Sequence, residues 1–493
     1  MVKRTTAAHL ATLALDPDDS APLYRQLYFA IREAILAGRL QPGARLPSTR
    51  TLARDLGLSR NTAVSAYEQL LTEGYLDGRI GAGSYVSTVL PEALLHARQS
   101  PPASGRERAP PPKLSRRGDM LAQLRSPQSL PPKPFSLGLP ELAAFPFEDW
   151  ARLLARRWRR PPSEFLVGGD PSGYRPLREA LAQYLGTARA VSCDPGQILI
   201  VSGAQQAMDL VARALIDPGD RVWVEEPGFS GTWGALLAAG ARLTPVPVDE
   251  EGIDVTQGRK LAPDARLICV SPSHQYPLGI TMTLRRRLEL LDWARAADAF
   301  VLEDDYDSEY RYAGRPLAAM QGLDDDGRII YVGSFSKVMF PGLRIGYMVA
   351  PPALVEPFLA IRRLLDSHPS SVAQAALADL IADGYLTSHI RRMRSLYAER
   401  QTALLKAVET TLGDRLQIAP DDAGMHLVGY LPNEVDDAEL SHRAAEHDVV
   451  APPLSAFYRG TPQRKGLLFG YAGVSEREIQ RATTRLATAL TDD

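Results

Sequence analysis

The chain has 493 residues, 45% of them hydrophobic and 23% charged, a composition typical of a globular protein with two or three domains. No apolar run reaches the roughly 20 residues that span a bilayer, and residues 1–10 lack the features of a secretory signal. The two cysteines, Cys193 and Cys269, provide neither a disulfide framework nor a metal-binding spacing. We therefore expect a cytoplasmic protein without a metal site.

Charge is distributed unevenly along the chain. Residues 1–134 contain 18 basic and 11 acidic side chains, a net charge of +7, so the remainder carries −9 of the overall −2. A basic N-terminal part joined to an acidic body predicts an anionic polymer as the partner of the first part alone.

Residues 1–90 predict three helices followed by a hairpin. The first helix lies between Pro22 and Gly38, and its apolar face is expected at Leu23, Leu27, Ile31 and Ile35. Two short helices with Ser48 and Ser59 as N-caps follow, in the layout of a helix-turn-helix. The buried stripe of the second is expected at Val64, Tyr67 and Leu71. The run "GYLDGRIGAGSYVS" then predicts a wing.

In a helix-turn-helix, the second helix enters the major groove with its N-terminal residues at the base edges. Here those residues are Arg60, Asn61 and Thr62. Arginine and asparagine make bidentate contacts to guanine and adenine. Phosphate contacts are expected from Ser48 and Arg50, and close approach of the wing backbone to the duplex at Gly81 and Gly83. Spacing alone leaves open a small helical bundle with an ordinary polar surface.

The head also resembles the winged-helix domain of the GntR regulator superfamily. The stretch from "PLYRQL" to "LLTEGYL" follows its pattern "G.L.PG..LPS.R.LA..L..SR.T...A...L...G" over almost its full length. The resemblance implies that the head binds double-stranded DNA.

The composition changes between residues 91 and 134, which contain ten prolines, eight basic residues and few large apolar ones. Such a segment cannot bury enough apolar surface to offset the entropy of ordering. We therefore predict a partly extended Pro/Arg-rich linker at 91–134, between a head at 1–90 and a body at 135–493.

The body alternates amphipathic helices with short apolar runs. The strand-like runs are "QILIVSG", "DRVWVEEPG", "ARLICVSPS", "AFVLEDDY", "RIIYVGS" and "RIGYMVA". This pattern predicts an α/β fold with a mostly parallel, doubly wound sheet that binds its ligand at the carboxyl ends of the strands.

Polar residues at those strand ends suit pyridoxal phosphate (PLP). This cofactor needs a lysine amine, a carboxylate for its ring nitrogen, donors for its phosphate and an aromatic face for its ring. Lys337 follows one strand, Asp304 ends another, and Tyr306 can donate to the phenolate oxygen. Phosphate donors are expected from Ala204 and Gln205 at a helix start, Ser334 and Arg344, and ring stacking from Phe229. Each residue alone has an ordinary structural explanation, but their joint occurrence predicts a PLP site.

The body also resembles the fold type I aminotransferases, in the blocks "SGAQQA", "PGF", "SPSHQYPLG", "EDDYDSEYRY" and "GSFSKVMFPGLRIGY". The resemblance implies a smaller C-terminal α+β subdomain, Lys337 as the Schiff-base lysine, and Asp304 and Tyr306 as partners of the ring. It adds His274 and Gln275 as candidate contacts to cofactor or ligand. It also implies a homodimer, in which Tyr174 reaches the site of the other subunit.

A winged helix, a proline-rich linker and an aminotransferase-like body together resemble the MocR subfamily of GntR regulators, which use the body as a sensor. One departure concerns the arginine with which aminotransferases bind a carboxylate, in a run like "RLGFA". The run here is "KGLLFGYAGVS", with Leu468 in that place, and leucine cannot form the fork that arginine provides. Arg464 or Lys465 can substitute from nearby.

The leading hypothesis is a PLP-dependent transcriptional regulator that binds two half-sites or direct repeats as a homodimer. It would sense a small amino compound, or PLP itself, through an internal aldimine on Lys337. An active aminotransferase with an accessory DNA-binding head is the alternative. A DNA-binding protein whose body is only a dimerisation scaffold is a third.

Overall fold

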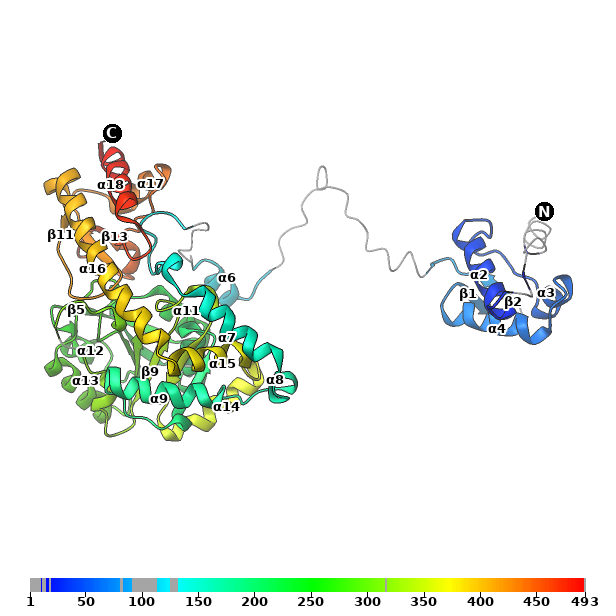
Figure 1. Ribbon diagram of the computed structural model, residues 1–493, viewed down its shortest axis with the longest axis horizontal. Coiled ribbons are helices and arrows are strands. Elements are labelled where there is room, and N and C mark those ends of the chain that lie inside the picture. Colours follow the sequence, from blue (N-terminus) through cyan, green and yellow to red (C-terminus); the bar gives the residue numbers. More distant parts are fainter. Residues whose placement is uncertain are drawn as a thin grey trace. The chain divides into compact units, whose positions relative to one another are not determined.

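The computed structural model describes residues 10, 15–16, 19–79, 83–90, 113–124, 132–314 and 317–491 (Figure 1). Contacts divide the chain into two compact units, residues 1–113 and 114–493. In these described ranges, no helix is long and apolar enough to cross a membrane, and no group of three His, Cys, Asp or Glu side chains is arranged to hold a metal ion.

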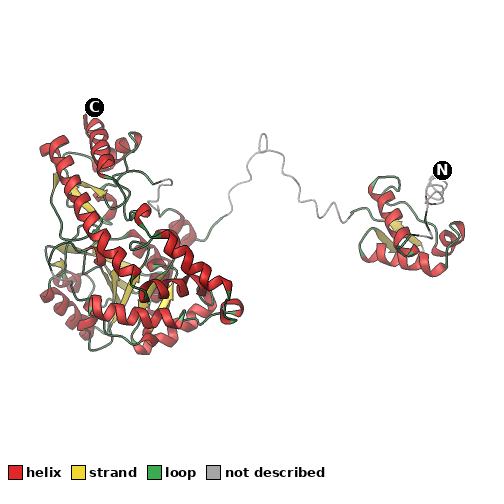
Figure 2. Ribbon diagram, viewed as in Figure 1, coloured by secondary structure: helices red, strands yellow, loops and turns green. Residues whose placement is uncertain are grey.

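The described part of the first unit consists of helices followed by a two-stranded sheet (Figure 2). Its elements are α2 (Leu23–Leu36), α3 (Thr49–Asp55), α4 (Arg60–Thr72), β1 (Leu76–Arg79) and β2 (Gly83–Val86). The two strands pair antiparallel, from Leu76 opposite Val86 to Arg79 opposite Gly83. The predicted helix-turn-helix and wing are thus confirmed.

Serine caps fix both helices of the motif. The Ser48 and Ser59 hydroxyls accept the backbone N–H of Thr51 and of Thr62, each at 3.1 Å, and satisfy donors that the first helical turn leaves unpaired. The predicted apolar face of α2 is confirmed at Leu27, Ile31 and Ile35, whereas Leu23 is only partly buried.

The predicted buried face of α4 is confirmed at Tyr67 but was wrong by one position at Val64 and Leu71. The buried residues are Ala63, Ala66, Tyr67 and Leu70, whereas Val64 and Leu71 are only partly buried. α4 packs against both α2 and α3, and its two small buried alanines allow close packing, so steric fit outweighs the larger apolar side chains.

The body is built on an eight-stranded sheet. In spatial order its strands are β3 (Ile198–Val201), β10 (Gly346–Val349), β9 (Ile329–Ser334), β8 (Phe300–Asp305), β7 (Leu267–Val270), β4 (Arg221–Glu226), β5 (Arg242–Asp249) and β6 (Gly252–Ile253). Strands β9, β8, β7, β4 and β5 pair parallel, and β10 is antiparallel to both β9 and β3. The mostly parallel doubly wound sheet is confirmed, and all six predicted runs are strands.

Strand β5 was not predicted, because Pro245 and Pro247 argue against a strand. Both prolines nevertheless lie in register with β4. The N–H of Arg242 donates to the carbonyl of Asp220, next to β4, so the even-numbered residues of β5 direct their N–H groups toward β4. The donors missing at Pro245 and Pro247 would therefore face away from β4. On that side β6 pairs only with Val248 and Asp249. Prolines are tolerated where no ladder bond is required.

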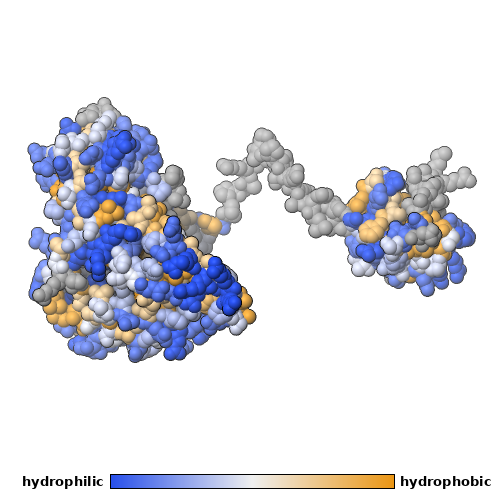
Figure 3. All heavy atoms as spheres, in the orientation of Figure 1, coloured by the Kyte–Doolittle hydropathy of each residue, from blue (hydrophilic) through white to orange (hydrophobic). Residues whose placement is uncertain are grey.

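Helices cover both faces of the sheet (Figure 1). Their bounds are α7 (Phe147–Arg159), α8 (Glu164–Val167), α9 (Arg175–Arg189), α10 (Ala204–Leu215), α11 (Ser230–Ala239), α12 (Val255–Leu261), α13 (Leu284–Ala296), α14 (Pro352–Leu365) and α15 (Ser371–Ala382). On the face seen in Figure 3, hydrophilic residues cover most of the body, with apolar residues scattered between them.

The C-terminal subdomain packs helices on a small antiparallel sheet, as expected. It contains α16 (Tyr385–Thr411), β11 (Gln417–Ile418), β12 (His426–Tyr430), α17 (Asp437–Glu446), β13 (Gly466–Gly470) and α18 (Glu476–Thr491). Its core includes Phe135, so the chain enters the subdomain at the predicted start of the body.

The predicted linker contains one described helix, α6 (Arg116–Ala122), capped by Ser115. It packs against α11, and the Arg117 guanidinium donates to the carbonyl of Ala238 at 3.0 Å. Part of the 91–134 segment is therefore attached to the body; most of the remainder lies outside the described residues.

Candidate functional site

The predicted cofactor residues gather at the carboxyl edge of the large sheet. Asp304 lies at the end of β8, Lys337 lies three residues after β9, and Phe229 follows β4. Gly203 lies between β3 and α10. Because these strands run in one direction, their ends meet at one edge, where ligands bind in doubly wound folds.

The Lys337 amine is held by a residue that the sequence reading missed. Its Nζ donates to the carbonyl of Gly138 at 3.0 Å. A Cβ at position 138, where φ is +64°, would lie 2.2 Å from that nitrogen, so only glycine fits. Burial lowers the pKa of Lys337, opposed by Asp307 and Asp304. A lowered pKa increases the share of neutral amine, the form that attacks an aldehyde.

Asp304 has an unsatisfied oxygen aimed at no protein group. Its Oδ1 is buried and has no hydrogen-bond partner in the described structure. Burial, together with Asp305 and Asp307, raises the pKa of Asp304 to about 7, and Lys337 opposes the shift. A buried acceptor of this kind fits a protonated ring nitrogen, so the residues present fit the cofactor at this point.

Tyr306 and His274 lie together beside this carboxylate. The Tyr306 hydroxyl is 2.8 Å from His274 Nδ1. Burial, reinforced by Asp307, raises the pKa of Tyr306 well above its ordinary value, so the hydroxyl keeps its proton and can donate. His274 also contacts Asp307 and Asp421, neither of which the sequence reading had singled out.

The N-terminus of α10 has the features of the predicted anion site. Its amides at Ala204 and Gln205 follow Gly203, whose φ is +118°. The Arg344 guanidinium reaches this turn, since a Cβ at Gly203 would lie 3.6 Å from its Nη1. The first turn of a helix leaves N–H groups unpaired and its dipole favours anions. Ser334 lies on β9, where its hydroxyl donates to Ser336 at 3.0 Å.

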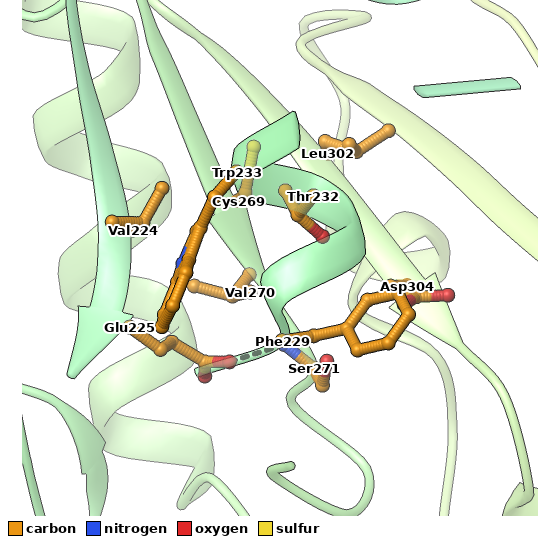
Figure 4. Close-up of a pocket in the computed structure, with 10 residues that line it drawn as sticks. All are labelled: Val224, Glu225, Phe229, Thr232, Trp233, Cys269, Val270, Ser271, Leu302 and Asp304. Atoms are coloured by element: carbon orange, nitrogen blue, oxygen red, sulfur yellow. Dashed lines mark hydrogen bonds between the residues drawn. The ribbon is translucent and has the colours of Figure 1, made fainter. Parts of the chain in front are cut away.

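Phe229 and Glu225 line one pocket with Asp304. The Phe229 ring, 39% exposed, packs edge to face on Tyr276 at 5.6 Å. Figure 4 shows Glu225 and Asp304 on opposite sides of this pocket, with the backbone N–H of Ser271 donating to Glu225. Glu225 Oε1 has no partner among the described residues, and burial raises the pKa of Glu225 to about 8. The sequence reading missed Glu225 because a carboxylate in "VEEPG" resembles an ordinary strand end.

Two predicted contacts have other partners in the structure. Gln275 donates to the carbonyls of Pro227 and Tyr276 and accepts from the N–H of Leu278, so its amide holds the turn rather than facing a ligand. Tyr174 is the N-cap residue of α9, where it packs edge to face on Phe165 and donates its N–H to Gln374.

Leu468 lies on β13 in an apolar cluster close to the site. It is fully buried with Leu454 and Phe457, and Tyr276 packs at the margin of the same cluster. The Arg464 guanidinium stacks on Tyr430, another residue at that margin, with its Cζ 3.5 Å from the ring centroid. The nearby cation is thus engaged with an aromatic face.

The predicted base-reading residues lie at the exposed start of α4. Arg60 and Asn61 are exposed, whereas Thr62 is partly buried beside its capping serine. Ser48 and Arg50 are also exposed, on and before α3. Gly83, with φ of +103°, lies against the Arg45 guanidinium, which sequence reasoning had not selected. Gly81 lies outside the described residues. Their contacts with DNA remain predictions.

Comparison with known proteins relates both units to families. Residues 135–486 match aminotransferase class I and II, and residues 23–86 match the gntR family of bacterial regulatory proteins. The chain is 44% identical to the probable rhizopine catabolism regulatory protein MocR of Rhizobium meliloti, over 97% of this chain and 96% of that protein. The chain belongs to the MocR-type regulators of the GntR family.

Further similarities agree with this MocR-type architecture. The pyridoxine biosynthesis transcriptional regulator PdxR of Corynebacterium glutamicum is 31% identical, over 97% of this chain and 98% of that protein. The kynurenine aminotransferase of Pyrococcus horikoshii, solved in complex with PMP, has a TM-score of 0.68 and 30% identity, covering 77% of this chain and 95% of that one. The family and fold indicate a DNA-binding head and pyridoxal phosphate as the cofactor of the body.

The raised pKa of Glu225 predicts a pH-dependent stability of the cofactor-free protein. Glu225 titrates near 8 when folded and near 4.5 when unfolded, so stability falls as the pH rises between these values. Glu225→Gln removes the titration. We expect the variant to melt at the wild-type temperature near pH 5. Near pH 8.5, where the wild type must bury a charged carboxylate, we expect the variant to melt roughly a few degrees higher.

Melting curves recorded by circular dichroism across that pH range measure this difference. Glu250→Gln, at an exposed glutamate, is the control and should follow the wild type throughout. Parallel pH profiles of wild type and Glu225→Gln would contradict the assignment of a buried, neutral Glu225.

Proposed function

We propose that this protein is a cytoplasmic transcriptional regulator that holds pyridoxal phosphate on Lys337 and binds DNA as a homodimer, in response to a small amine or to the cofactor itself. The observation that carries the proposal is the Lys337 amine, partly desolvated and fixed to Gly138 on the same sheet edge as the unpartnered Asp304 oxygen. When bound, the cofactor supplies an aldehyde that captures amines covalently and a ring that withdraws electrons.

The residues of the chain take distinct parts in holding this group. The α10 amides, Arg344 and Ser334 would hold the phosphate, Asp304 would accept the ring N–H, and Tyr306 would donate to the phenolate oxygen. Phe229 would cover one face of the ring.

The effector is proposed to be an amine recognised without an arginine fork on β13. Leu468 presents an apolar side chain at the place where the aminotransferase resemblance expects arginine, and its neighbours are aromatic and aliphatic. Arg464 is stacked on Tyr430, so a carboxylate would have to compete with that contact. An amine without a carboxylate, whose remaining part is apolar or uncharged, fits these surroundings better than an amino acid.

Homodimer formation is supported by exposed apolar side chains on the body. Among them are Leu364 and Val167, at 88% and 85%, and Leu166 and Trp158, at 63% and 57%. The end of α8 lies close to the segment after α14, since a Cβ at Gly169 would lie 3.1 Å from His368 Nδ1. Large apolar side chains exposed to this degree suit a surface that a second copy covers.

Removal of the lysine tests the cofactor proposal. Full-length protein incubated with pyridoxal phosphate is expected to gain a visible absorbance band that survives gel filtration, and Lys337→Ala is expected to lose it because no amine remains to attach the aldehyde. Lys260→Ala, at an exposed lysine, is the matched control.

DNA binding of the same variants separates the alternatives. Ligand-dependent DNA affinity in the wild type, lost in Lys337→Ala, supports a sensor. If Lys337→Ala regulates normally, the result supports the alternative in which the body is only a dimerisation scaffold. Rapid amine transfer that persists after deletion of residues 1–90 would favour an aminotransferase.

Arg60 is proposed to read a base edge. Arg60→Ala is expected to weaken operator binding by about 1–3 kcal/mol and to relax sequence preference at one position of each half-site. Affinity for random DNA should change much less, as measured by fluorescence anisotropy on both DNAs. Arg54→Ala is the matched control, because Arg54 pairs with Asp55 at the far end of α3. Equal losses on operator and random DNA would make Arg60 a phosphate contact.

A further inference from the structure

A cluster of ionisable side chains connects Tyr306 with the C-terminal subdomain. At its centre is His274, in the turn after β7, with only 2% of its surface exposed. Its Nδ1 lies 2.8 Å from the Tyr306 hydroxyl and 3.1 Å from Asp307 Oδ2, and its Nε2 lies 3.4 Å from Asp421 Oδ2. Asp307 follows β8, whereas Asp421 belongs to the loop between β11 and β12. The imidazole therefore lies between the carboxylates of Asp307 and Asp421, which come from the large-sheet part of the body and from the C-terminal subdomain.

The two carboxylates hold His274 as a cation. Burial alone would lower its pKa, but Asp307 and Asp421 raise the pKa of His274 to about 10. Two aromatic residues of the described structure that pack near this cluster, His426 and Tyr276, carry no positive charge that would oppose the shift. Burial and the charge of His274 lower the pKa of His426 to about 4, and the His426 Nε2–H donates to the Pro277 carbonyl at 3.0 Å. Tyr276 packs on His426 and Tyr306, and burial raises its pKa, so it stays neutral.

The protonation state of His274 decides where the Tyr306 proton points. A neutral imidazole with its proton on Nε2, toward Asp421, presents a lone pair at Nδ1 and draws the Tyr306 proton to itself. A cationic imidazole carries a proton on Nδ1 as well. The Tyr306 oxygen then faces a donor, and its own proton is free for another acceptor.

We propose that His274 and Asp421 are positioning residues that direct the Tyr306 proton toward the phenolate oxygen of the cofactor, so that the C-terminal subdomain acts on the chemistry at Lys337. The inference rests on the proposed function, because it requires the cofactor beside Tyr306. A movement that withdraws Asp421 removes one of the two carboxylates, weakens the His274 cation and thereby weakens the hydrogen bond that Tyr306 donates. The contact from Asp421 to His274 then transmits the position of one subdomain to the site in the other.

A pH titration of the visible absorbance of the full-length, cofactor-loaded protein tests this relay. A donor to the phenolate oxygen stabilises the deprotonated chromophore, so weakening that donor moves the titration midpoint to higher pH. His274→Gln, which cannot carry a charge, is expected to raise the midpoint by about one pH unit, and Asp421→Asn by less in the same direction. Asp422→Asn is the matched control, because Asp422 pairs with Arg311 and should leave the midpoint unchanged.

A double variant shows whether the effect passes through Tyr306. Tyr306→Phe removes the donor, so adding His274→Gln to it should produce no further shift. An additive double variant, or wild-type midpoints in both His274→Gln and Asp421→Asn, would overturn the relay. A wild-type protein that gains no visible band would instead contradict the cofactor proposal itself.

Nitrogen NMR of histidine-labelled protein gives a readout that does not need the cofactor. His274 is expected to show the shifts of an imidazolium at pH 8 in the wild type, and to lose its proton at lower pH in Asp421→Asn. A neutral His274 at pH 8 in the wild-type protein would refute the relay, whatever the absorbance shows.

Discussion

The direction of the strands in the large sheet is the constraint on which the site depends. β9, β8, β7, β4 and β5 pair parallel, and β3 shares their direction because it and β9 are both antiparallel to β10. Most of these strands are buried along their length, so reactive side chains can reach a ligand only where a strand ends. Groups far apart in the chain, such as Gly203, Asp304 and Lys337, are brought to one edge for this reason.

The collected site is electrostatically incomplete. Asp304 Oδ1, Glu225 Oε1 and Asp307 Oδ1 are buried and lack hydrogen-bond partners within the described residues. Leaving such atoms unpaired costs free energy, which a protein tolerates where a ligand supplies the missing partner. A protonated ring nitrogen would supply the missing hydrogen-bond donor for Asp304. The pKa of Lys337 is lowered, which increases the share of its neutral amine. The chain thus lines the proposed ring position with carboxyl groups, whereas the start of α10 and Arg344 face the proposed phosphate position.

Sequence reasoning identified the parts of this arrangement that local patterns encode. Strand ends, helix caps and the positions of Lys337 and Asp304 at strand ends follow from short stretches, and so they were predicted. Gly138 and Asp421 were missed, because each acts on a residue brought near only by tertiary packing. The buried face of α4 was misjudged at two positions for the same reason, because steric fit to other elements decided which side chains are buried. The main-chain partners of Gln275 likewise depend on tertiary packing, and its contact with cofactor or ligand remains a prediction. Such partners cannot be inferred from residue type alone, because they depend on which elements pack together in the folded protein.

A ligand on Lys337 can change DNA affinity only if it binds two arrangements of the body unequally. The turn at residues 271–279 is the structural element best placed to distinguish them. It touches the ring site through Tyr276 and the C-terminal subdomain through both His274 and the Pro277 carbonyl. A ligand that displaces Tyr276 or alters the charge at Tyr306 therefore acts on the same turn as a shift of the subdomain. The coupling free energy is reciprocal. A ligand that raises DNA affinity by stabilising one state of residues 271–279 would therefore itself bind more tightly to the DNA-bound protein.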